Sequence, residues 1–319
     1  MPAKIRIGTS GFGYSDWVGR HEKTKIPFYP SILSEQQRLA YYSEVFPTVE
    51  INTSFYHFPR PSVVQKWEKH VPENFLFAFK IPKAITHEKK LVDFGVDLER
   101  FLDTMQGGLR RKIGPALLQL PPKFSDDHRS ALAVFLRNWP SDLKLAVEFR
   151  EMSWIKHLSQ TTDLLSNYNA AFCIVDEPLL PPITPVTADF SYIRFHGHGL
   201  KIWYQYLYTH KELLAWSKKI EVLQDETKEI FTYFNNHPGG HAPANARQLA
   251  ILLKQPLPKP EKIDLTRVRK RAGEEPQTSL DQYLDVPDVQ IDDFIRFCSN
   301  CGDTVMKLDK YCENCGFLL

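Results

Sequence analysis

Residues 116–149 read ALLQLPPKFSDDHRSALAVFLRNWPSDLKLAVEF and contain a complete strand, helix and strand pattern. Ala116–Leu120 and Lys144–Phe149 are short, nearly continuous apolar runs, as expected of parallel strands that are covered on both faces. Between them, Asp127–Asn138 repeats its apolar residues at helical spacing. The stretch therefore predicts one unit of a parallel α/β fold.

The same alternation continues on both sides of this unit. Further helical spacing occurs in Ser31–Phe46, Thr209–Leu223 and Asn245–Lys254. Six more apolar runs predict strands, namely Ile5–Gly8, Thr48–Asn52, Phe75–Lys80, Ala170–Asp176, Ser191–His196 and Glu229–Asn235. Eight strands alternating with helices predict a TIM-like (β/α) barrel. The alternative is an open doubly wound sheet, which normally has fewer strands and a Gly-rich phosphate loop. The proline-rich segment EPLLPPITPVTA, Glu177–Ala188, predicts a loop instead of the sixth helix.

Composition and charge limit the possible functions. The 319 residues are 43% hydrophobic and 24% charged, and the net charge of +2 gives no strong general attraction to nucleic acid or membranes. No apolar run approaches the roughly 20 residues of a membrane span. The N-terminal residues lead into a strand-like run without an apolar signal segment. We expect a cytoplasmic protein that does not bind membranes.

The pattern changes near residue 256, so we expect three regions. Residues 1–256 form the barrel, residues 257–293 a partly disordered linker, and residues 294–319 a small zinc ribbon. The linker contains the basic cluster Arg267–Arg271, which is a candidate for phosphate contacts. A solvated connector without a binding role is the alternative.

The zinc prediction rests on the cysteines. Four of the five cysteines lie in the last 22 residues, in the motifs FCSNCG (297–302) and YCENCG (311–316). Two CxxC knuckles place four thiolates in the tetrahedral arrangement that zinc prefers, and this segment resembles the zinc-ribbon modules of many bacterial and archaeal proteins. The predicted ligands of one structural Zn²⁺ are Cys298, Cys301, Cys312 and Cys315. Redox-active pairs and a rubredoxin-like iron site are the alternatives. Cys173 lies in an apolar run and is expected in the core.

Polar residues follow or end most of the predicted strands. Barrel closure brings strand ends into one ring, at the face where barrel enzymes keep their chemistry. For proton transfer we expect Glu148, Asp176 and His196. For ligand binding we expect Glu50, Asn52, Lys80, Arg150, Arg194 and Asn235. One alternative is an ion-pair network that only plugs the barrel. Another is a metal site built from Glu50, Glu148, Asp176 and His196, although no metal-binding spacing supports it.

The loops after the predicted strands carry many aromatic residues, which suit stacking on sugars or nucleobases. They are Tyr14, Trp17, Phe55, Tyr56, Trp154, Trp203, Tyr204 and Tyr206. The alternative is that these rings pack over the helices.

Several short motifs together resemble the YecE-like family, whose barrel is known as domain of unknown function 72. The resemblance spans about residues 5–252 and rests on GTSG (8–11), TVEINTSFY (48–56), QLPP (119–122), EFR (148–150), RFHG (194–197), FNN (234–236) and ANA (244–246). It implies a TIM-like barrel but supplies no reaction. We expect an enzyme-like barrel that binds a small anionic ligand, a nucleotide or a sugar phosphate. A non-catalytic protein that binds nucleic acid through barrel, linker and ribbon is the alternative, and a third possibility is a protein partner bound by the ribbon.

Overall fold

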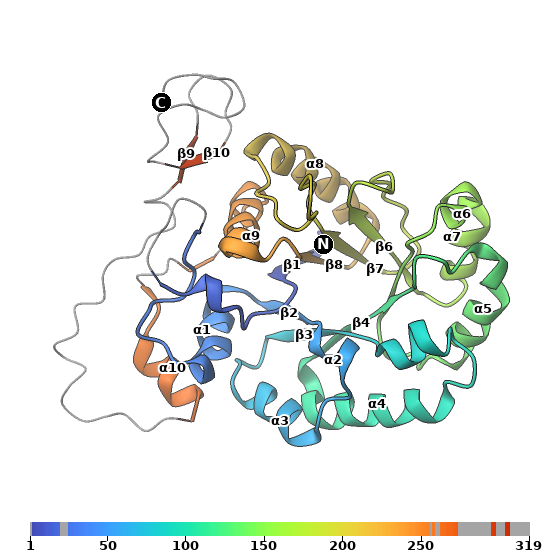
Figure 1. The fold of residues 1–319 in the computed structure, drawn as a ribbon, viewed down its shortest axis with the longest axis horizontal. Coiled ribbons are helices and arrows are strands. Elements are labelled where there is room, and N and C mark those ends of the chain that lie inside the picture. Colours follow the sequence, from blue (N-terminus) through green and yellow to red (C-terminus); the bar gives the residue numbers. More distant parts are fainter. Residues whose placement is uncertain are drawn as a thin grey trace.

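Eight parallel strands form the core of the protein (Figure 1). The computed structural model describes residues 2–19, 25–255, 257–258, 262–273, 295–297 and 304–306. The strands are β1 (Lys4–Thr9), β2 (Thr48–Ile51), β3 (Leu76–Lys80), β4 (Ile113–Gln119), β5 (Leu145–Glu148), β6 (Ala171–Asp176), β7 (Phe190–Phe195) and β8 (Glu229–Phe234). Each hydrogen-bonded neighbour is parallel, in the order β1-β8-β7-β6-β5-β4-β3-β2. The predicted α/β barrel is confirmed.

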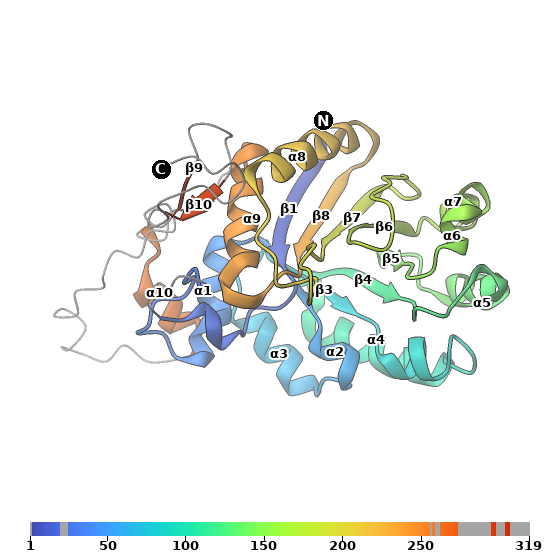
Figure 2. The same ribbon diagram turned by 45° about the horizontal axis from the view of Figure 1, so that its top comes forward.

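Helices surround the sheet on its outer side, as Figures 1 and 2 both show. They are α1 (Arg38–Val45), α2 (Thr53–Tyr56), α3 (Pro61–Lys69), α4 (Gly95–Leu109), α5 (Arg129–Asn138), α6 (Ser153–Lys156), α7 (Leu158–Ser166), α8 (His210–Glu226), α9 (His241–Leu252) and α10 (Leu265–Arg271). Between β6 and β7 the chain, which is described throughout, forms no helix, so the predicted proline-rich loop is confirmed. None of the described helices has the length and apolar character needed to cross a membrane. The cytoplasmic location stays a prediction.

Alternation along the strands separates the buried side chains into two groups. One group fills the barrel interior and includes Leu117, Cys173, Tyr192 and Tyr233, of which Cys173 is only 1% exposed. The other group lies between the strands and the surrounding helices. Polar residues with the interior parity are therefore carried to the same end of the barrel interior.

The barrel closes less regularly between β1 and β2 than elsewhere. The amide of Thr9 donates to the hydroxyl of Tyr42 (2.8 Å), and this hydroxyl donates to the carbonyl of Thr48 (3.1 Å). A side-chain hydroxyl thus takes the place of a direct ladder bond. Beyond it, the amide of Gly11 donates to the carbonyl of Glu50 at 2.8 Å.

Gly8 lies at the same seam, where the two strands come very close. A Cβ atom on Gly8 would lie 2.1 Å from the carbonyl oxygen of Thr48, far inside van der Waals contact. Only glycine permits this approach. The first glycine of the GTSG motif is therefore explained by barrel closure.

Part of the region between barrel and C-terminus packs on the barrel. Helix α10 lies beside α1 in both ribbon views, and Val268 is fully buried between them. Arg267 and Arg271 from the basic cluster pair with Glu44 of α1. Within residues 294–319, Ile295–Phe297 (β9) and Thr304–Met306 (β10) pair in antiparallel fashion. The four cysteines predicted to bind zinc lie outside the described residues.

Candidate functional site

Most of the predicted site residues meet inside the barrel, at the C-terminal ends of the strands. The pairing of the strands explains why these residues lie together. Gln119 lies opposite Glu148, and Glu50 lies opposite Ala78, whose side chain belongs to the barrel interior. We call the connected set the polar cluster. It consists of Glu50, Gln119, Glu148, Arg150, Glu177, Arg194, His196 and Asn235, with Lys80 beside it.

Arg194 joins two buried carboxylates. Its Nη2 lies 2.8 Å from Oε1 of Glu50, and its Nη1 lies 2.5 Å from Oε2 of Glu148. Glu50 also accepts hydrogen bonds from the hydroxyls of Ser10 and Tyr192, each at 2.7 Å. Neither carboxylate is exposed to solvent. All of their charge is therefore balanced inside the protein.

Arg150 extends the network toward the barrel mouth. It pairs with Glu148 through Nη2 and with Glu177 through Nη1, the latter at 2.6 Å. The amide of Gln119 donates to Glu148 at 2.7 Å. Carboxylates and guanidiniums thus alternate along one chain of contacts.

The guanidiniums keep both central carboxylates ionised. Burial acts to raise the pKa of Glu50 and Glu148, but the positive charges outweigh it. Arg194 lowers the pKa of Glu50 below its usual range, and Arg150 and Arg194 lower the pKa of Glu148 well below it. Burial raises the pKa of Glu177 above its ordinary value. At neutral pH Glu50 and Glu148 are therefore both ionised, and their oxygens already accept hydrogen bonds from neighbouring side chains.

His196 is neutral in this environment. Burial, followed by the charges of Arg150 and Arg194, lowers its pKa to about 4. Its Nε2 lies 3.1 Å from Nη2 of Arg150, and a guanidinium can only donate, so Nε2 is the acceptor. Nδ1 then carries the proton and lies 3.0 Å from the side-chain amide of Asn235, which accepts this proton when the amide oxygen is turned toward the ring. His196 is held in one orientation by contacts on both nitrogens.

Lys80 differs from the other charged groups of this site. The residue is 9% exposed, and its Nζ lies 3.7 Å from the centre of the Phe55 ring. The ammonium makes no hydrogen bond or ion pair with any other residue that the structure describes. Burial, and after it the charge of Arg194, lowers the pKa of Lys80 to about 7, although Glu148 and Glu50 act in the opposite direction. Lys80 therefore titrates near neutral pH.

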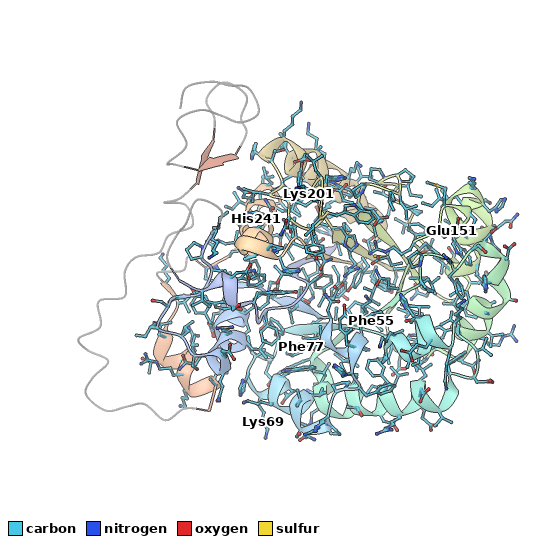
Figure 3. The ribbon with its side chains drawn as sticks, viewed as in Figure 1. Phe55, Lys69, Phe77, Glu151, Lys201 and His241 are labelled. Carbon is cyan, nitrogen blue, oxygen red and sulfur yellow. The ribbon has the colours of Figure 1, made fainter. Side chains whose placement is uncertain are left out.

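Phe55 lies near the middle of the molecule in Figure 3, whereas Lys69 and Glu151 lie near its edge. The ring of His87 stands edge-on to Phe55, with 5.0 Å between the ring centres. Burial and the positive charge of Lys80 lower the pKa of His87 to about 4. The aromatic ring under the Lys80 amine is thus flanked by a neutral imidazole.

Two predicted site residues have no contact with the network. The register places Val175 opposite Arg194 and Asp176 opposite Phe195, so the Asp176 side chain points to the other strand face. There it lies 3.1 Å from Nε2 of His198. Asn52 follows the last residue of β2, and its buried Oδ1 has no partner among the described residues.

Sequence reasoning missed other members of the site. Glu177 shares its parity with Val175, and this signal identifies it as the interior residue that follows β6. Ser10 and Tyr192, which both donate to Glu50, have the same kind of signal. If the alternation of side chains is followed strictly along each strand, these residues are included in the site and Asp176 is excluded from it.

An aromatic wall stands next to the cluster. The His237 ring stacks on Tyr14 with 4.3 Å between ring centres, and Tyr204 stacks on His237 at 5.2 Å. The Tyr14 hydroxyl donates to the carbonyl of Ser10, which connects the wall to the cluster. Tyr204 is 41% exposed. By contrast, Trp17 and Trp154 are fully buried and pack in the core.

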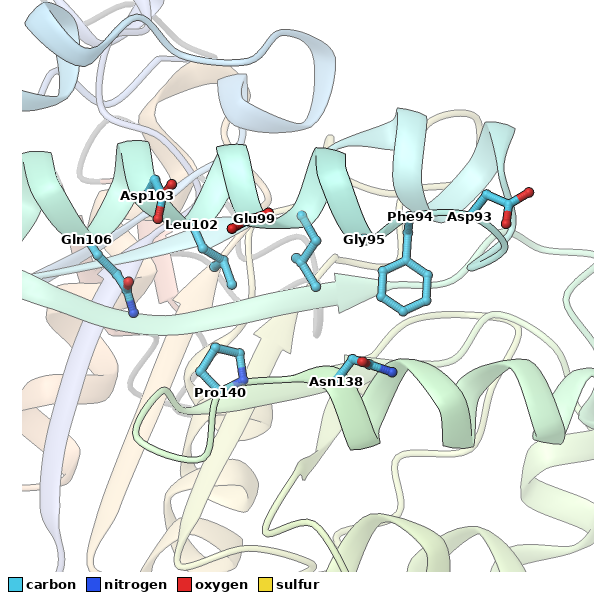
Figure 4. A pocket seen from close by; sticks show the side chains of 10 residues that line it. Asp93, Phe94, Gly95, Glu99, Leu102, Asp103, Gln106, Asn138 and Pro140 are labelled. Carbon is cyan, nitrogen blue, oxygen red and sulfur yellow. The ribbon is translucent and has the colours of Figure 1, made fainter.

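Two hollows on the molecule lie away from the cluster. One of about 480 Å³ lies between α4 and the end of α5, outside the barrel (Figure 4), and has Phe94, Leu102 and Pro140 in its wall. Another of about 530 Å³ lies at the opposite end of the strands, near Lys144 and Asp189. No residue of the polar cluster lines either hollow. In the described part of the chain, no group of three or more His, Cys, Asp or Glu side chains is placed to hold a metal ion.

Comparisons with known proteins agree with the fold. The family model "Protein of unknown function DUF72" matches residues 6–266. The UPF0759 protein YunF of Bacillus subtilis is 30% identical over 279 residues, which cover 78% of this chain and 94% of YunF. The UPF0759 protein YecE of Escherichia coli is 36% identical over 109 residues, or 34% of this chain and 40% of YecE.

Solved structures of DUF72 family proteins have a similar fold. The crystal structure of a DUF72 family protein from Thermotoga maritima has a TM-score of 0.69 and 31% sequence identity, and the match covers 79% of this chain and 100% of that one. A DUF72 family protein from Enterococcus faecalis has a TM-score of 0.66 at 24% identity, covering 80% of this chain and 97% of that one, which supports the fold alone.

Proposed function

The chain belongs to the DUF72 family of proteins of unknown function, and we propose that its polar cluster binds a small anionic ligand, a nucleotide or a sugar phosphate. The observation that carries this proposal is the isolation of Lys80. The residue is 9% exposed, and its ammonium lacks an anionic partner among the described residues. A ligand anion supplies the partner that Lys80 lacks.

The other cations of the cluster are less available. Arg194 already binds Glu50 and Glu148, and its side chain is 3% exposed. The Arg150 side chain is 16% exposed and also pairs with carboxylates. Lys80 is therefore the first contact for the anion, and Arg150 the second.

The aromatic wall suits the rest of such a ligand. Tyr14 and Tyr204 lie on either side of His237, and Tyr14 is hydrogen-bonded to the loop that also supplies Ser10 to Glu50. Exposed aromatic faces stack on sugars and nucleobases. This arrangement favours a ligand with a ring beside its anionic group.

In an enzymatic form of the proposal, Lys80 is the group for proton transfer, because its pKa of about 7 suits reaction at neutral pH. Glu148 and His196 stay in the proposed catalytic set as groups that hold Arg150 and Arg194 in position. Asp176 leaves that set because it faces the other side of β6.

Calorimetric titration with inorganic phosphate, AMP and glucose 6-phosphate tests the proposal. We expect at least one of these probes to bind, and Lys80→Met to weaken that binding by about tenfold or more, the effect of losing a charge-assisted contact. The control is Lys69→Met, which removes an exposed lysine of α3. No binding by the wild type, or equal affinity in Lys80→Met, overturns the proposal.

A second candidate function is nucleic-acid binding by barrel, α10 and ribbon, with a structural Zn²⁺ on the four C-terminal cysteines. Helix α10 contains Arg267, Arg269, Lys270 and Arg271 in one short segment, which favours phosphate contacts. Two of these side chains are paired with Glu44, which reduces the charge that is left for nucleic acid. Binding of the full chain to single-stranded RNA that falls steeply with salt supports this candidate. The ribbon also stays a proposed site for a protein partner.

A further inference from the structure

The surroundings of Lys80 suit an amine that reacts as well as one that binds. Nζ lies over the Phe55 ring, and the neutral imidazole of His87 stands edge-on to the same ring. Arg194 and Arg150 act on Lys80 with positive charge, and Glu148 and Glu50 with negative charge. No carboxylate in the described segments pairs directly with Nζ. The lone pair of the free amine is therefore not blocked by an ion pair.

We propose that Lys80 is a nucleophile that forms a reversible imine with a small aldehyde or ketone at the C-terminal face of the barrel. This inference rests on the proposed binding function of the same site and names its substrate class, an anionic carbonyl compound. A lysine that is desolvated and adjacent to other cations is the kind that performs this chemistry.

The step needs no co-reactant. The Nζ lone pair attacks the carbonyl carbon, and the carbonyl π electrons move to oxygen, which takes up a proton. The carbinolamine then loses its oxygen as water, while nitrogen supplies the electron pair of the new C=N bond. One carbonyl, one neutral amine and one proton from solvent give one iminium and one water, and addition of water reverses the reaction.

The charges of the cluster accommodate the iminium. Glu50, Glu148 and Glu177 balance Arg150, Arg194 and protonated Lys80. An iminium carries the same charge as the ammonium that it replaces, so the balance is preserved. Meanwhile burial and Arg194 lower the pKa of Lys80 to about 7, so a large fraction of the amine is unprotonated before the reaction.

Reductive trapping tests the proposal directly. The full-length protein is incubated with glyceraldehyde 3-phosphate and cyanoborohydride, and the modified lysines are identified by peptide mass spectrometry. We expect Lys80 to be alkylated about tenfold or more faster than the exposed Lys69 in the same sample. The rate at Lys80 should increase with pH up to about 7 and then level off. Equal or slower modification of Lys80 overturns the proposal.

Lys80→Arg separates this inference from plain anion binding. Arginine keeps the positive charge but is not a nucleophile, so we expect phosphate binding to persist and alkylation at this position to vanish. Binding of phosphate by the wild type without preferential trapping at Lys80 overturns the imine and leaves the proposed function intact. Equal trapping with glyceraldehyde and with its 3-phosphate supports the imine and contradicts the anionic specificity. The comparison of Lys80 with Lys69 uses one protein, so it decides even where a variant fails to fold.

Discussion

The ammonium of Lys80 lies over the ring of Phe55, with Nζ 3.7 Å from the ring centre. A cation–π contact of this kind contributes about 2 kcal/mol when the cation is desolvated. Burial of an ammonium without a carboxylate costs several kcal/mol even after local relaxation. The burial penalty is the larger effect, and it explains why the pKa of Lys80 falls to about 7.

Lys80→Met should therefore stabilise the protein at pH 6. A fall of the pKa from 10.5 to about 7 corresponds to a penalty on the order of 5 kcal/mol. The unfolded chain keeps this proton up to its own, higher pKa, so the penalty is complete below pH 7 and fades between pH 7 and 10.5. Denaturant unfolding of wild type and variant from pH 6 to pH 10 measures the difference. We expect the variant's advantage to shrink as the pH rises.

Lys69→Met is the control for this comparison, because it removes an exposed lysine from α3. Its unfolding free energy should stay within about 0.5 kcal/mol of wild type at every pH. A clear loss of stability in Lys80→Met at pH 6 would mean that Lys80 has a counter-charge that holds it in place.

Glu148→Gln should have the opposite effect. It removes the charge that Arg150 and Arg194 share, and it leaves two buried guanidiniums short of one partner. We expect a loss of about 3 to 5 kcal/mol at pH 7, as found when one member of a buried pair is removed. Thermal and denaturant unfolding measure it, with Glu221→Gln on the exposed face of α8 as the control. A neutral outcome contradicts the network described above.

Taken together, these two variants separate a binding site from a structural plug. A site in which the Lys80 ammonium has no direct ion-pair partner predicts that Lys80→Met gains stability and loses phosphate binding. A plug predicts that both Lys80→Met and Glu148→Gln lose about 3 kcal/mol or more. In the second case Lys80 would not be a functional residue.

The strands were predictable because parallel barrel strands are apolar on both faces. The run predicted at 170–176 matches β6 (Ala171–Asp176), and the run at 229–235 matches β8 (Glu229–Phe234). The polar residues near the ends of the runs 144–149 and 191–196 indicated Glu148 and Arg194, which lie in the cluster because side chains of the same parity meet inside the barrel.

The remaining features of the site depend on three-dimensional packing. Asp176 is one residue out of phase with Val175, so it lies on the outer face although it ends a strand as the others do. The isolation of Lys80 depends on which carboxylates the two arginines occupy, and sequence spacing does not specify that pairing. The hydrogen bond from the Thr9 amide to the Tyr42 hydroxyl at the β1–β2 seam likewise joins residues that are 33 positions apart in the sequence.

Gly8→Ala should destabilise the barrel at the β1–β2 seam. The new Cβ would lie 2.1 Å from the carbonyl oxygen of Thr48, so the strands must move apart or bend. Overpacking of this kind costs about 1 to 3 kcal/mol or more. Gly13→Ala is the matched control, because nothing lies within 4 Å of its Cβ position. Denaturant unfolding that gives equal stability for both variants would contradict the close seam.

The C-terminal segment should bind one zinc ion per chain, since Cys298, Cys301, Cys312 and Cys315 form two CxxC knuckles. Elemental analysis of the purified protein measures the ratio, and Cys312→Ser should lower it. Cys173→Ser is the control, because Cys173 is buried inside the barrel and far in sequence from the knuckles.

Metal removal should then affect one part of the chain only. A segment this short depends on the metal for its folding energy, whereas the barrel has its own core. A chelator should increase proteolysis after residue 290 and leave the unfolding midpoint of the barrel unchanged within about 1 °C, because the eight barrel strands pair with one another around a core of their own. A metal-free wild type, or full zinc occupancy in Cys312→Ser, contradicts the zinc assignment. If the chelator lowers the unfolding midpoint of the barrel, the C-terminal segment docks on the barrel and contributes to its stability.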